Sequence, residues 1–433
     1  MRTLAMCTLA LVLVAGCGSG QAGTTTGTPA ACVCIWPVYR GDKARDGHPG
    51  GPMLTAGQAR RLKVAWAAHL DGPIDGSPIT VPTFQHGLVV VATTEAGEIA
   101  MVSENTGTVF WKRTGLGKFS GSPAVEGARL LAATLTGHVY AFDISDGRTL
   151  WDWTAPGGHP AIWSSPIVAL ATGYVVLLGV GSQYGDHPLE PGRVVALDLG
   201  SGQAAWTLCV EANCAPGGGV WSSVAVDGAG RGFVGTGNPD DGVIAFDVAT
   251  GQRLWATSLN ADQGRDLDVG ATPIVLSLSG REMVAVGSNG GVFAELDASS
   301  GSVIWSKALV AGSAVHGLIA SPAYDGESLY VASASPPTGM FALDPQTGRM
   351  RWQHRTNLPV YSAPAVGDGV VIFGTGDVFG DAHQGGLLAL SASDGAVLWS
   401  YDAHSSVFSA PAIVATTLLV GDTRGDLLAF VPG

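Results

Sequence analysis

The sequence has few charged residues and no cluster of basic ones. Charged side chains make up 13% of the 433 residues, and 22 Lys and Arg face 35 Asp and Glu, which gives a formal net charge of −13. Proteins that bind nucleic acid need a basic patch to neutralise phosphates, so a nucleic-acid partner is disfavoured. The patterns Gly-x-Ser-x-Gly, His-Glu-x-x-His and Cys-x-x-Cys-His are also absent. Serine-hydrolase, zinc-protease and covalent-haem chemistry therefore have no motif to support them.

Long apolar runs are also scarce. The N-terminal stretch Leu4–Val14 follows the single charge of Arg2 and is too short to span a membrane as a helix. It runs into LVAGC, which ends at Cys17 and is similar to a bacterial lipoprotein signal. We therefore expect residues 1–16 to be a signal peptide, Cys17 to be lipidated, and residues 17–35 to form a flexible tether. An ordinary secretory signal is the alternative. Either way the protein is exported, and lipidation predicts a membrane anchor facing the periplasm or the cell exterior.

Cysteines are few, and their number suits an exported protein. Of six, Cys7 leaves with the signal and Cys17 takes the lipid, so four remain: Cys32, Cys34, Cys209 and Cys214. An even number in an oxidising compartment indicates disulfides, and three pairings are open. We favour a Cys209–Cys214 disulfide, with the other two either paired or bonded elsewhere. A zinc site is disfavoured, because no His lies at ligand spacing from either pair.

Glycine and proline, in contrast, are abundant, with 63 and 24 residues. The segment Ala245–Trp255, AFDVATGQRLW, predicts a strand, a turn and a second strand. Gly251 permits a positive φ at the turn, Asp247 can accept backbone N–H groups, and Trp255 supplies a large apolar face. Further copies of this pattern, two of them looser, end at Trp111, Trp151, Trp206, Trp305, Trp352 and Trp399.

Together with Trp66, these Trp residues recur every 40 to 55 residues, which is the spacing of β-propeller blades. We predict an all-β, eight-bladed β-propeller of four-stranded antiparallel blades over residues 36–433. Leu62–Leu70 is a lone strand, and Ala410–Phe430 gives three strands without a closing Trp. The N-terminal strand is expected to complete the last blade and close the ring, which removes two sheet edges. The preceding segment from Trp36 has no repeat partner and is expected to pack against the ring.

The blades also predict where a site lies. Each innermost strand is expected to begin at a small residue, usually followed by Pro, because the axis is crowded. In an up-and-down blade, the start of strand one and the end of strand two lie at the same end, so these residues share one face of the ring. Three loops after strand two are long and polar, and such loops often carry function: Gly179–Gly192, Gly235–Gly242 and Gly374–Gly386.

The repeat Ala-x-Asp-x-x-x-Gly-x-x-x-Trp resembles that of pyrroloquinoline quinone (PQQ) propellers over residues 36–433. That family includes quinoprotein alcohol and polyvinyl alcohol dehydrogenases. It also includes cofactor-free members such as the propeller lipoprotein of the outer-membrane barrel-assembly machinery. Three segments of blades four and five are similar to successive dehydrogenase motifs: Gly217–Ser223, Gly235–Pro239 and Asp266–Pro273.

This resemblance implies roles for individual residues. Trp221, flanked by Gly219 and Ser222, corresponds to the residue that stacks under the quinone. Asn238 corresponds to a Ca²⁺ ligand, and Asp266 or Asp268 to the catalytic base. The residue types suit these tasks, since an indole face matches a flat cofactor, an amide oxygen suits a hard cation, and a carboxylate can accept a proton.

Three family features are not matched. The Glu that ligates calcium after strand two of blade three has no partner in clear register, although Asp186 and Glu190 lie in that loop as candidate metal ligands. A Lys or Arg in blade five is replaced by Gly287–Gly290, and Cys209 and Cys214 are not adjacent as the family pair is.

Simpler interpretations of the motif residues are a face-lining aromatic for Trp221, a turn residue for Asn238 and loop caps for Asp266 and Asp268. Two functions follow. One is a quinoprotein-type dehydrogenase that oxidises an alcohol with PQQ and Ca²⁺ and passes electrons to a cytochrome or another acceptor. The other is a non-catalytic, lipid-anchored scaffold or binding propeller with protein partners in the cell envelope.

Overall fold

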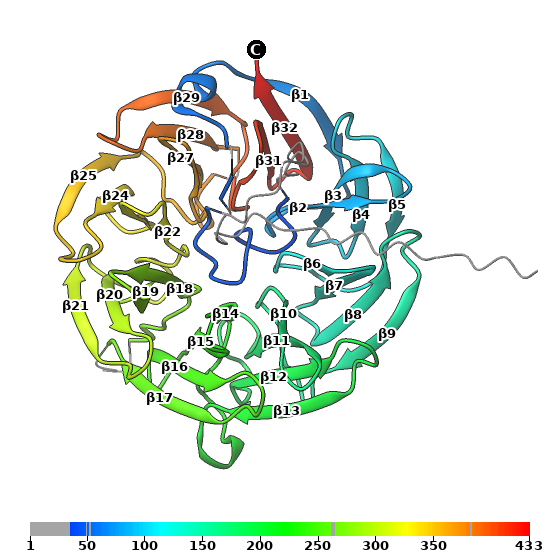
Figure 1. Cartoon of the computed structure of the whole chain (residues 1–433), viewed down its shortest axis with the longest axis vertical. Helices are drawn as coiled ribbons and strands as arrows, with labels where there is room; N and C mark the ends of the chain where they lie inside the picture. Colours follow the sequence, from blue (N-terminus) through cyan, green and yellow to red (C-terminus); the bar gives the residue numbers. More distant parts are fainter. Residues whose placement is uncertain (1–34, 49, 52, 261–264, 382) are drawn as a thin grey trace, which may run out of the picture.

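The computed structural model describes residues 35–433 except 49, 52, 261–264 and 382. The predicted signal peptide, the tether, Cys17, Cys32 and Cys34 lie outside the described residues. Eight four-stranded antiparallel sheets surround a central axis, which confirms the predicted eight-bladed propeller (Figure 1). The described part also holds a short helix α1 (Ala56–Ala59) and a 3-10 turn η1 (Ala212–Cys214). None of the described helices is long and apolar enough to cross a membrane.

Blades one to four follow one another along the chain, and each runs from an innermost to an outermost strand. Blade one comprises β2 (Ile79–Thr83), β3 (Gly87–Thr93), β4 (Ile99–Ser103) and β5 (Val109–Arg113). Blade two comprises β6 (Ala124–Glu126), β7 (Arg129–Ala133), β8 (His138–Asp143) and β9 (Thr149–Thr154). Blade three comprises β10 (Ile167–Leu170), β11 (Tyr174–Val180), β12 (Arg193–Asp198) and β13 (Ala204–Cys209). Blade four comprises β14 (Ala225–Val226), β15 (Arg231–Gly235), β16 (Gly242–Asp247) and β17 (Arg253–Ser258).

Blades five to seven repeat this order, and blade eight joins the two ends of the described chain. Blade five comprises β18 (Ile274–Leu278), β19 (Arg281–Gly287), β20 (Val292–Asp297) and β21 (Val303–Ala308). Blade six comprises β22 (Ala323–Tyr324), β23 (Leu329–Ser333), β24 (Gly339–Leu343) and β25 (Met350–Arg355). Blade seven comprises β26 (Ala365–Gly367), β27 (Val370–Gly376), β28 (Gly385–Ser391) and β29 (Val397–Asp402). Blade eight comprises β30 (Ala412–Val414), β31 (Thr417–Gly421), β32 (Asp426–Pro432) and, as its outer strand, β1 (Leu62–His69).

The N-terminal strand closes the ring as predicted. β1 pairs antiparallel with β32, from Leu62 opposite Pro432 to His69 opposite Asp426, and Figure 1 shows the blue and red strands side by side. Pairing the first strand with the last leaves no free sheet edge between the two ends of the chain.

Adjacent blades are joined by the repeat Trp residues. Each indole N–H donates to a backbone carbonyl of the next blade at 2.7–3.1 Å, and the bond from Trp399 to Leu62 completes the circle. In blades one to seven, the repeat Gly packs on the indole face of the Trp of the preceding blade. Gly251, for example, has a φ of 72°, and a Cβ there would come within 2.5 Å of the Trp206 ring. The repeat Gly is therefore required twice, for its backbone conformation and for close approach of the Trp.

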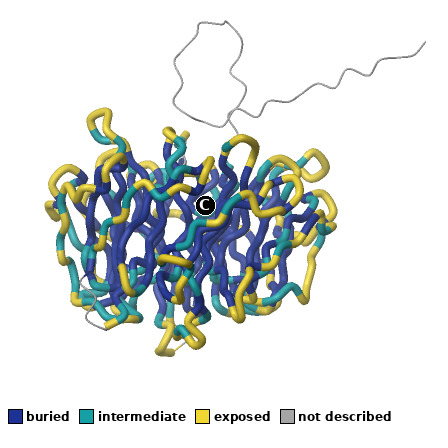
Figure 2. Tube along the Cα trace, turned by 90° about the horizontal axis from the view of Figure 1, so that it is seen from below, coloured by how far each residue is buried: buried dark blue, intermediate teal, exposed yellow. Residues whose placement is uncertain are grey.

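The side view shows the buried strands as the middle of the disc and the exposed loops at its two ends (Figure 2). Apolar clusters of buried residues fill the spaces within and between blades. A rigid scaffold of this kind leaves the axis and the end loops to build a site.

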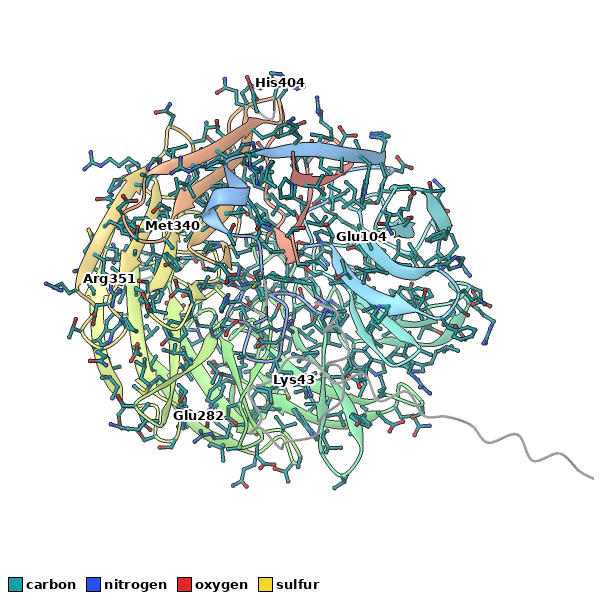
Figure 3. All side chains as sticks on the ribbon, turned by 45° about the horizontal axis from the view of Figure 1, so that its top comes forward. Lys43, Glu104, Glu282, Met340, Arg351 and His404 are labelled. Carbon is teal, nitrogen blue, oxygen red and sulfur yellow. A yellow bond between two sulfur atoms is a disulfide. The ribbon has the colours of Figure 1, made fainter. Side chains whose placement is uncertain are left out.

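The lead-in segment Trp36–Gly47 lies at the axis rather than simply against the ring, and we call it the axial plug (Figure 1). Figure 3 places its residue Lys43 near the centre, whereas Arg351 and His404 lie at the periphery. The plug's backbone carbonyls accept hydrogen bonds from innermost-strand N–H groups of six blades, those of Thr80, Val125, Val226, Val275, Tyr324 and Val366.

Two arginines of the plug, Arg40 and Arg45, are fully buried, with no exposed surface. Arg45 donates to the carbonyls of Tyr39 at 2.6 Å and Val224 at 3.0 Å, and to those of Ser165 and Pro166 at 3.3 Å. Arg40 donates to Pro322 O and Pro364 O, just before the innermost strands of the adjacent blades six and seven. A buried charge is tolerated when its donors are satisfied, so the plug ties innermost strands together at one end of the central channel.

Candidate functional site

The open end of the central channel forms an axial pocket of about 200 Å³. Its rim repeats one position, two residues before the small residue that starts each innermost segment. We call this set the axial rim: Asp75, Ser120, Trp163, Trp221, Gly270, Ile319, Tyr361 and Phe408. One blade contributes each residue, so the composition of the rim is set blade by blade.

The wall of the pocket is a ring of small residues one step deeper: Ser77, Ser122, Ser165, Ser223, Thr272, Ser321, Ala363 and Ala410. In blades two to six, the hydroxyl of each blade accepts the N–H of the equivalent residue in the blade before it. These bonds, from Ser77 N to Ser122 Oγ through to Thr272 N to Ser321 Oγ, are 2.7–3.1 Å long. The predicted small residues are therefore both fillers of a crowded axis and links between blades.

The floor of the pocket is Tyr39 of the axial plug. Its hydroxyl shares a hydrogen bond of 3.1 Å with Ser321 Oγ, and the Arg45 guanidinium lies 5.6 Å from the centre of its ring. The plug closes the far side, so a ligand enters this pocket from the rim.

Four of the predicted residues meet at one side of this pocket. Trp221 lines it, and its indole N–H donates to Asp268 Oδ2 at 2.6 Å. The other oxygen, Asp268 Oδ1, accepts the Asn238 backbone N–H at 3.2 Å, and Asn238 Nδ2 donates to Asp266 Oδ1 at 2.9 Å. These side chains come from the loops before β14, after β15 and before β18. The predicted common face therefore assembles them from two blades.

Local packing holds Trp221 in place. A Cβ on Gly270 would overlap the six-membered ring of Trp221, so glycine at this rim position makes room for the indole of the neighbouring blade. Behind the indole, Asp268 approaches Gly237, where a Cβ would lie 2.8 Å from Asp268 Oδ2. The two glycines thus let an aromatic ring and a carboxyl pack edge to edge.

Asp268 is electrostatically unusual. Burial, together with the charges of Asp266 and Asp241, raises its pKa to about 8, against the lowering effect of the Trp221 hydrogen bond. A carboxyl with a pKa near neutrality can exchange a proton at physiological pH, as a general base must. Perturbed carboxyls of this kind concentrate at functional sites.

Gly219 and Ser222 lie beside Trp221, but their hydrogen bonds hold the backbone at the end of β15. Ser222 is 1% exposed, and its hydroxyl bonds both the N–H and the carbonyl of Gly235, at 2.9 and 3.1 Å. The Gly219 carbonyl accepts the Gly237 N–H at 2.9 Å. Both residues thus fix the strand end that carries Asn238.

The structure does not bring Asp186 and Glu190 to this cluster. Glu190 is 6% exposed, and its Oε1 accepts the His159 N–H at 2.6 Å, at the loop between blades two and three. Asp186 lies part-exposed in the loop after β11. Their predicted role as metal ligands stays a prediction without a contact to Asn238.

The donor set fits a hard cation in its chemistry. Asn238 Oδ1 is buried without a hydrogen-bond partner in the described structure, beside the carboxyls of Asp266 and Asp268. Amide and carboxylate oxygens are the ligands that Ca²⁺ prefers. No group of three or more His, Cys, Asp or Glu side chains arranged for a metal occurs among the described residues. The pocket lining contains no Lys, Arg or His, so the pocket wall supplies no positive charge to an anionic cofactor.

Cys209 and Cys214 form the predicted disulfide, with Cα atoms 5.1 Å apart. The bridge follows the outer strand β13 and spans η1, and Arg253 of blade four donates to the Cys209 carbonyl at 3.0 Å. It therefore constrains an outer loop between blades three and four.

Sequence reasoning did not assign a site role to three polar residues of the pocket. Asp75 lies on the rim, and burial together with the charge of its hydrogen-bonded neighbour Glu95 raises its pKa to about 8. Ser77 and Tyr361 also line the pocket, and neither hydroxyl has a hydrogen-bond partner in the described structure. Aligning the blades on their small residues would have placed Asp75 and Tyr361 in the same register as Trp221.

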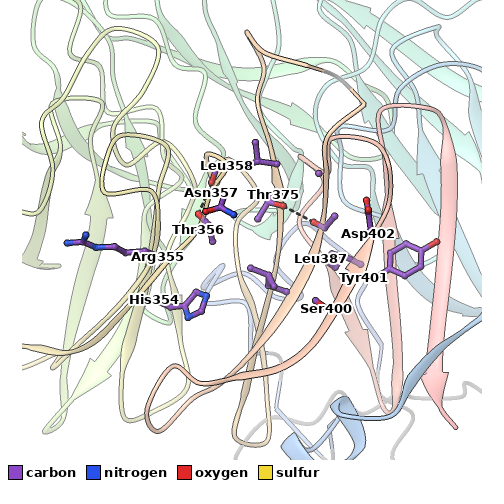
Figure 4. Close-up of a pocket in the computed structure, with 13 residues that line it drawn as sticks. His354, Arg355, Thr356, Asn357, Leu358, Thr375, Leu387, Ser400, Tyr401 and Asp402 are labelled. Atoms are coloured by element: carbon purple, nitrogen blue, oxygen red, sulfur yellow. Dashed lines mark hydrogen bonds between the residues drawn. The ribbon is translucent and has the colours of Figure 1, made fainter.

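A larger cavity of about 410 Å³ lies away from the axis, between blades six and seven (Figure 4). His354 and Asn357 of blade six and Ser400 and Asp402 of blade seven line it, and Thr375 Oγ1 donates to the Gly386 carbonyl at 3.4 Å. The ring of Tyr401, in contrast, points away and packs on Phe430 of blade eight. None of the predicted site residues lines this cavity.

The chain matches a family model described as outer membrane protein assembly factor BamB over residues 54–215, 239–334 and 288–433. It is 26% identical over 386 residues to the polyvinylalcohol dehydrogenase of Sphingopyxis sp. (strain 113P3), which covers 73% of this chain and 58% of that protein. It is 28% identical over 236 residues to the outer membrane protein assembly factor BamB of Nitrosomonas eutropha (strain DSM 101675 / C91 / Nm57), which covers 53% of this chain and 51% of that protein. The chain thus spans between half and three fifths of these two relatives.

Among solved structures, the quinohemoprotein alcohol dehydrogenase from Comamonas testosteroni superposes with a TM-score of 0.78 at 16% identity. The superposition covers 93% of this chain and 81% of that one. At this identity the likeness shows a shared fold.

Proposed function

The chain belongs to the propeller family described as outer membrane protein assembly factor BamB, and within it we propose that this protein is a quinoprotein-type dehydrogenase that oxidises an alcohol with PQQ and Ca²⁺. One observation carries the proposal. Trp221, Asn238, Asp266 and Asp268, from three separate segments, form one hydrogen-bonded cluster beside the axial pocket. The likeness to polyvinylalcohol dehydrogenase, named for an alcohol substrate, supports it.

Asn238 Oδ1 and the Asp266 carboxylate would hold the cation, and the exposed face of Trp221 would support the quinone. When bound, the quinone with its cation accepts two electrons from the substrate. The side chains of the protein would orient the alcohol and accept its proton. The Trp221 N–H fixes Asp268 Oδ2, and the Asp268 carboxylate would take the alcohol proton as a base. A cation held beside it would lower the pKa of this carboxyl and so favour its ionised form at pH 7.

The test is a titration of the purified protein with PQQ, with and without Ca²⁺, followed by Trp fluorescence and quinone absorbance. We expect saturable binding that requires Ca²⁺ and is weakened at least about tenfold by Trp221→Ala, because the stacking face is lost. Trp163→Ala is the matched control, since it removes the indole at the equivalent rim position of the neighbouring blade. Absence of saturable binding, or equal losses in the two variants, would contradict this assignment.

A second function, a non-catalytic binding propeller with protein partners in the cell envelope, is favoured by a different observation. The pocket lining has no basic residue, and Glu190 is held by the His159 N–H instead of joining Asn238. The BamB relatives support envelope partners for such a protein. The same titration separates the two, because a scaffold does not bind PQQ.

In both cases we propose an exported lipoprotein anchored through Cys17, with a cytochrome or another electron acceptor as partner if the protein is catalytic. Metabolic labelling with a fatty acid should mark the wild-type protein and not Cys17→Ser. Equal labelling of the two would rule out Cys17 as the anchor.

A further inference from the structure

The half of the axial pocket opposite Trp221 has its own polar groups. In an eight-bladed ring, blade one faces blade five across the axis, so Asp75 lies across the pocket from Gly270 and the cluster behind Trp221. We propose that the axial pocket binds a small primary organic amine in its ammonium form, with the charge on Asp75 and Ser77 and the apolar body against the aromatic rim.

The strongest observation in favour of a ligand is the hydroxyl of Ser77. This residue is 2% exposed and lines the pocket, yet its hydroxyl has no hydrogen-bond partner in the described structure. Its backbone N–H is already used by Ser122 Oγ, so the free hydroxyl is not needed for the links between blades. A buried polar atom without a partner costs free energy unless something else satisfies it.

The ionisable side chains of the pocket favour a cationic ligand over an anionic one. Asp75 is the one acidic side chain in the lining of this pocket, and the lining contains no Lys, Arg or His. Behind Asp75 stands Glu95, which pairs with Lys118 at 2.6 Å. Lys118 is thus held by Glu95, and an incoming ammonium finds the Asp75 carboxyl without a strong cationic competitor in the pocket. An anion would meet a carboxyl instead.

Aromatic side chains supply the rest of the surface. Trp163, Trp221, Tyr361 and Phe408 are four of the eight rim residues, and Tyr361 and Phe408 meet edge to face with ring centres 5.8 Å apart. Aromatic faces attract organic cations as well as apolar groups. The pocket volume of about 200 Å³ suits a ligand the size of a single substituted ring.

This inference goes beyond the proposed function, because it requires neither a quinone nor a cation. The ammonium group depends on Asp75 and Ser77 of blade one, whereas the cation and the base of the proposed dehydrogenase depend on Asn238, Asp266 and Asp268 of blades four and five, so that the two sites share only the aromatic surface of Trp221. The two proposals can therefore fail separately.

Calorimetry on the full purified chain, without PQQ and without Ca²⁺, tests it with three probes of one shape: benzylamine, benzyl alcohol and benzoate. We expect benzylamine to bind at least about tenfold more tightly than benzyl alcohol, and benzoate not to bind. Because the pKa of Asp75 is raised to about 8, benzylamine binding at pH 7 should also release a proton, seen as a dependence of the heat on buffer ionisation.

Variants assign the effect to residues. Asp75→Asn should remove the preference for the amine and leave benzyl alcohol binding unchanged, which also shows that the variant is folded. Ser77→Ala should weaken benzylamine selectively, and the exposed neighbour Asp71→Asn is the matched control that changes neither. Equal binding of amine and alcohol to the wild type, or an amine preference that survives Asp75→Asn, would overturn the proposal. So would the absence of benzylamine binding at millimolar concentration.

Discussion

Replacing Asp75 by Asn should stabilise the folded protein at alkaline pH. Burial and the charge of Glu95 raise the pKa of Asp75 from 3.8 to about 8 in the folded state. Between these two values the folded protein holds a proton that the unfolded chain has lost, so stability falls as pH rises through this window. Asparagine keeps the shape of the neutral side chain and cannot ionise, so the variant should escape this loss.

The size of the effect follows from the pKa shift. Each pH unit between the two pKa values changes stability by about 1.4 kcal/mol for one proton. From pH 5 to pH 8 the upper bound is therefore about 4 kcal/mol. Asp75 shares its hydrogen bond with Glu95 at the edge of an open pocket, and solvent screening reduces the expected gain to about 2 kcal/mol. Below pH 3.8, where Asp75 is protonated in both the folded and the unfolded protein, the pKa shift gives neither protein an advantage, and the advantage of the variant should grow steadily from pH 5 to pH 8.

The assay is urea unfolding of the wild type and Asp75→Asn at pH 5, 6, 7 and 8. The measured quantity is the difference between their free energies of unfolding, because other titrating groups cancel in it. Asp71→Asn, an exposed substitution in the same loop, should show no difference that changes with pH. A variant less stable than the wild type at pH 8, or a difference that stays constant from pH 5 to pH 8, would refute the electrostatic account of Asp75.

Three further changes test the plug, the site and a buried acid. Arg45→Met should lower the free energy of unfolding by about 3–5 kcal/mol, because it leaves four buried carbonyls without their donor. In the same urea unfolding assay, the exposed substitution Arg349→Met should change this free energy by less than about 0.5 kcal/mol. Gly270→Ala should displace Trp221 and weaken PQQ binding at least about tenfold in the fluorescence titration, while circular dichroism stays unchanged. Burial raises the pKa of Glu295 to about 7, so Glu295→Gln should be more stable than the wild type in urea unfolding at pH 8 but not at pH 4. An equal gain in stability at both pH values would contradict this.

The propeller was predictable because its determinants are local and repeated. The pattern around Gly251 and Trp255 encodes a hairpin by itself, and its recurrence gives the period of a blade. What the pattern could not reveal is that each Gly also receives the Trp of the preceding blade, as Gly251 receives Trp206. That contact joins residues about 45 positions apart, and only the closed ring brings them together.

The site was predictable in part, for the same reason. The resemblance to dehydrogenase motifs singled out Asn238, Asp266 and Asp268, and topology predicted that their loops lie on one face of the ring. Glu190 was not predictable, since its partner is a backbone N–H of His159 in another loop. The charge of Arg45 gave no sign of burial, because its acceptors are carbonyls supplied by distant strands.

The architecture explains why function concentrates at a single position of the repeat. Two demands act on each innermost segment. The residues at the wall must be small, and in five blades they carry a hydroxyl that accepts the neighbouring N–H, so they have little freedom. The rim position two residues earlier escapes both demands, because its side chain points at the ligand space. Across the eight blades it varies from Gly270 through Asp75 to Trp221. In the closed ring, the eight rim residues can therefore vary independently and still line one pocket. Placing an acid at blade one and an indole at blade four gives the two sides of that pocket different chemistry without any change in the fold.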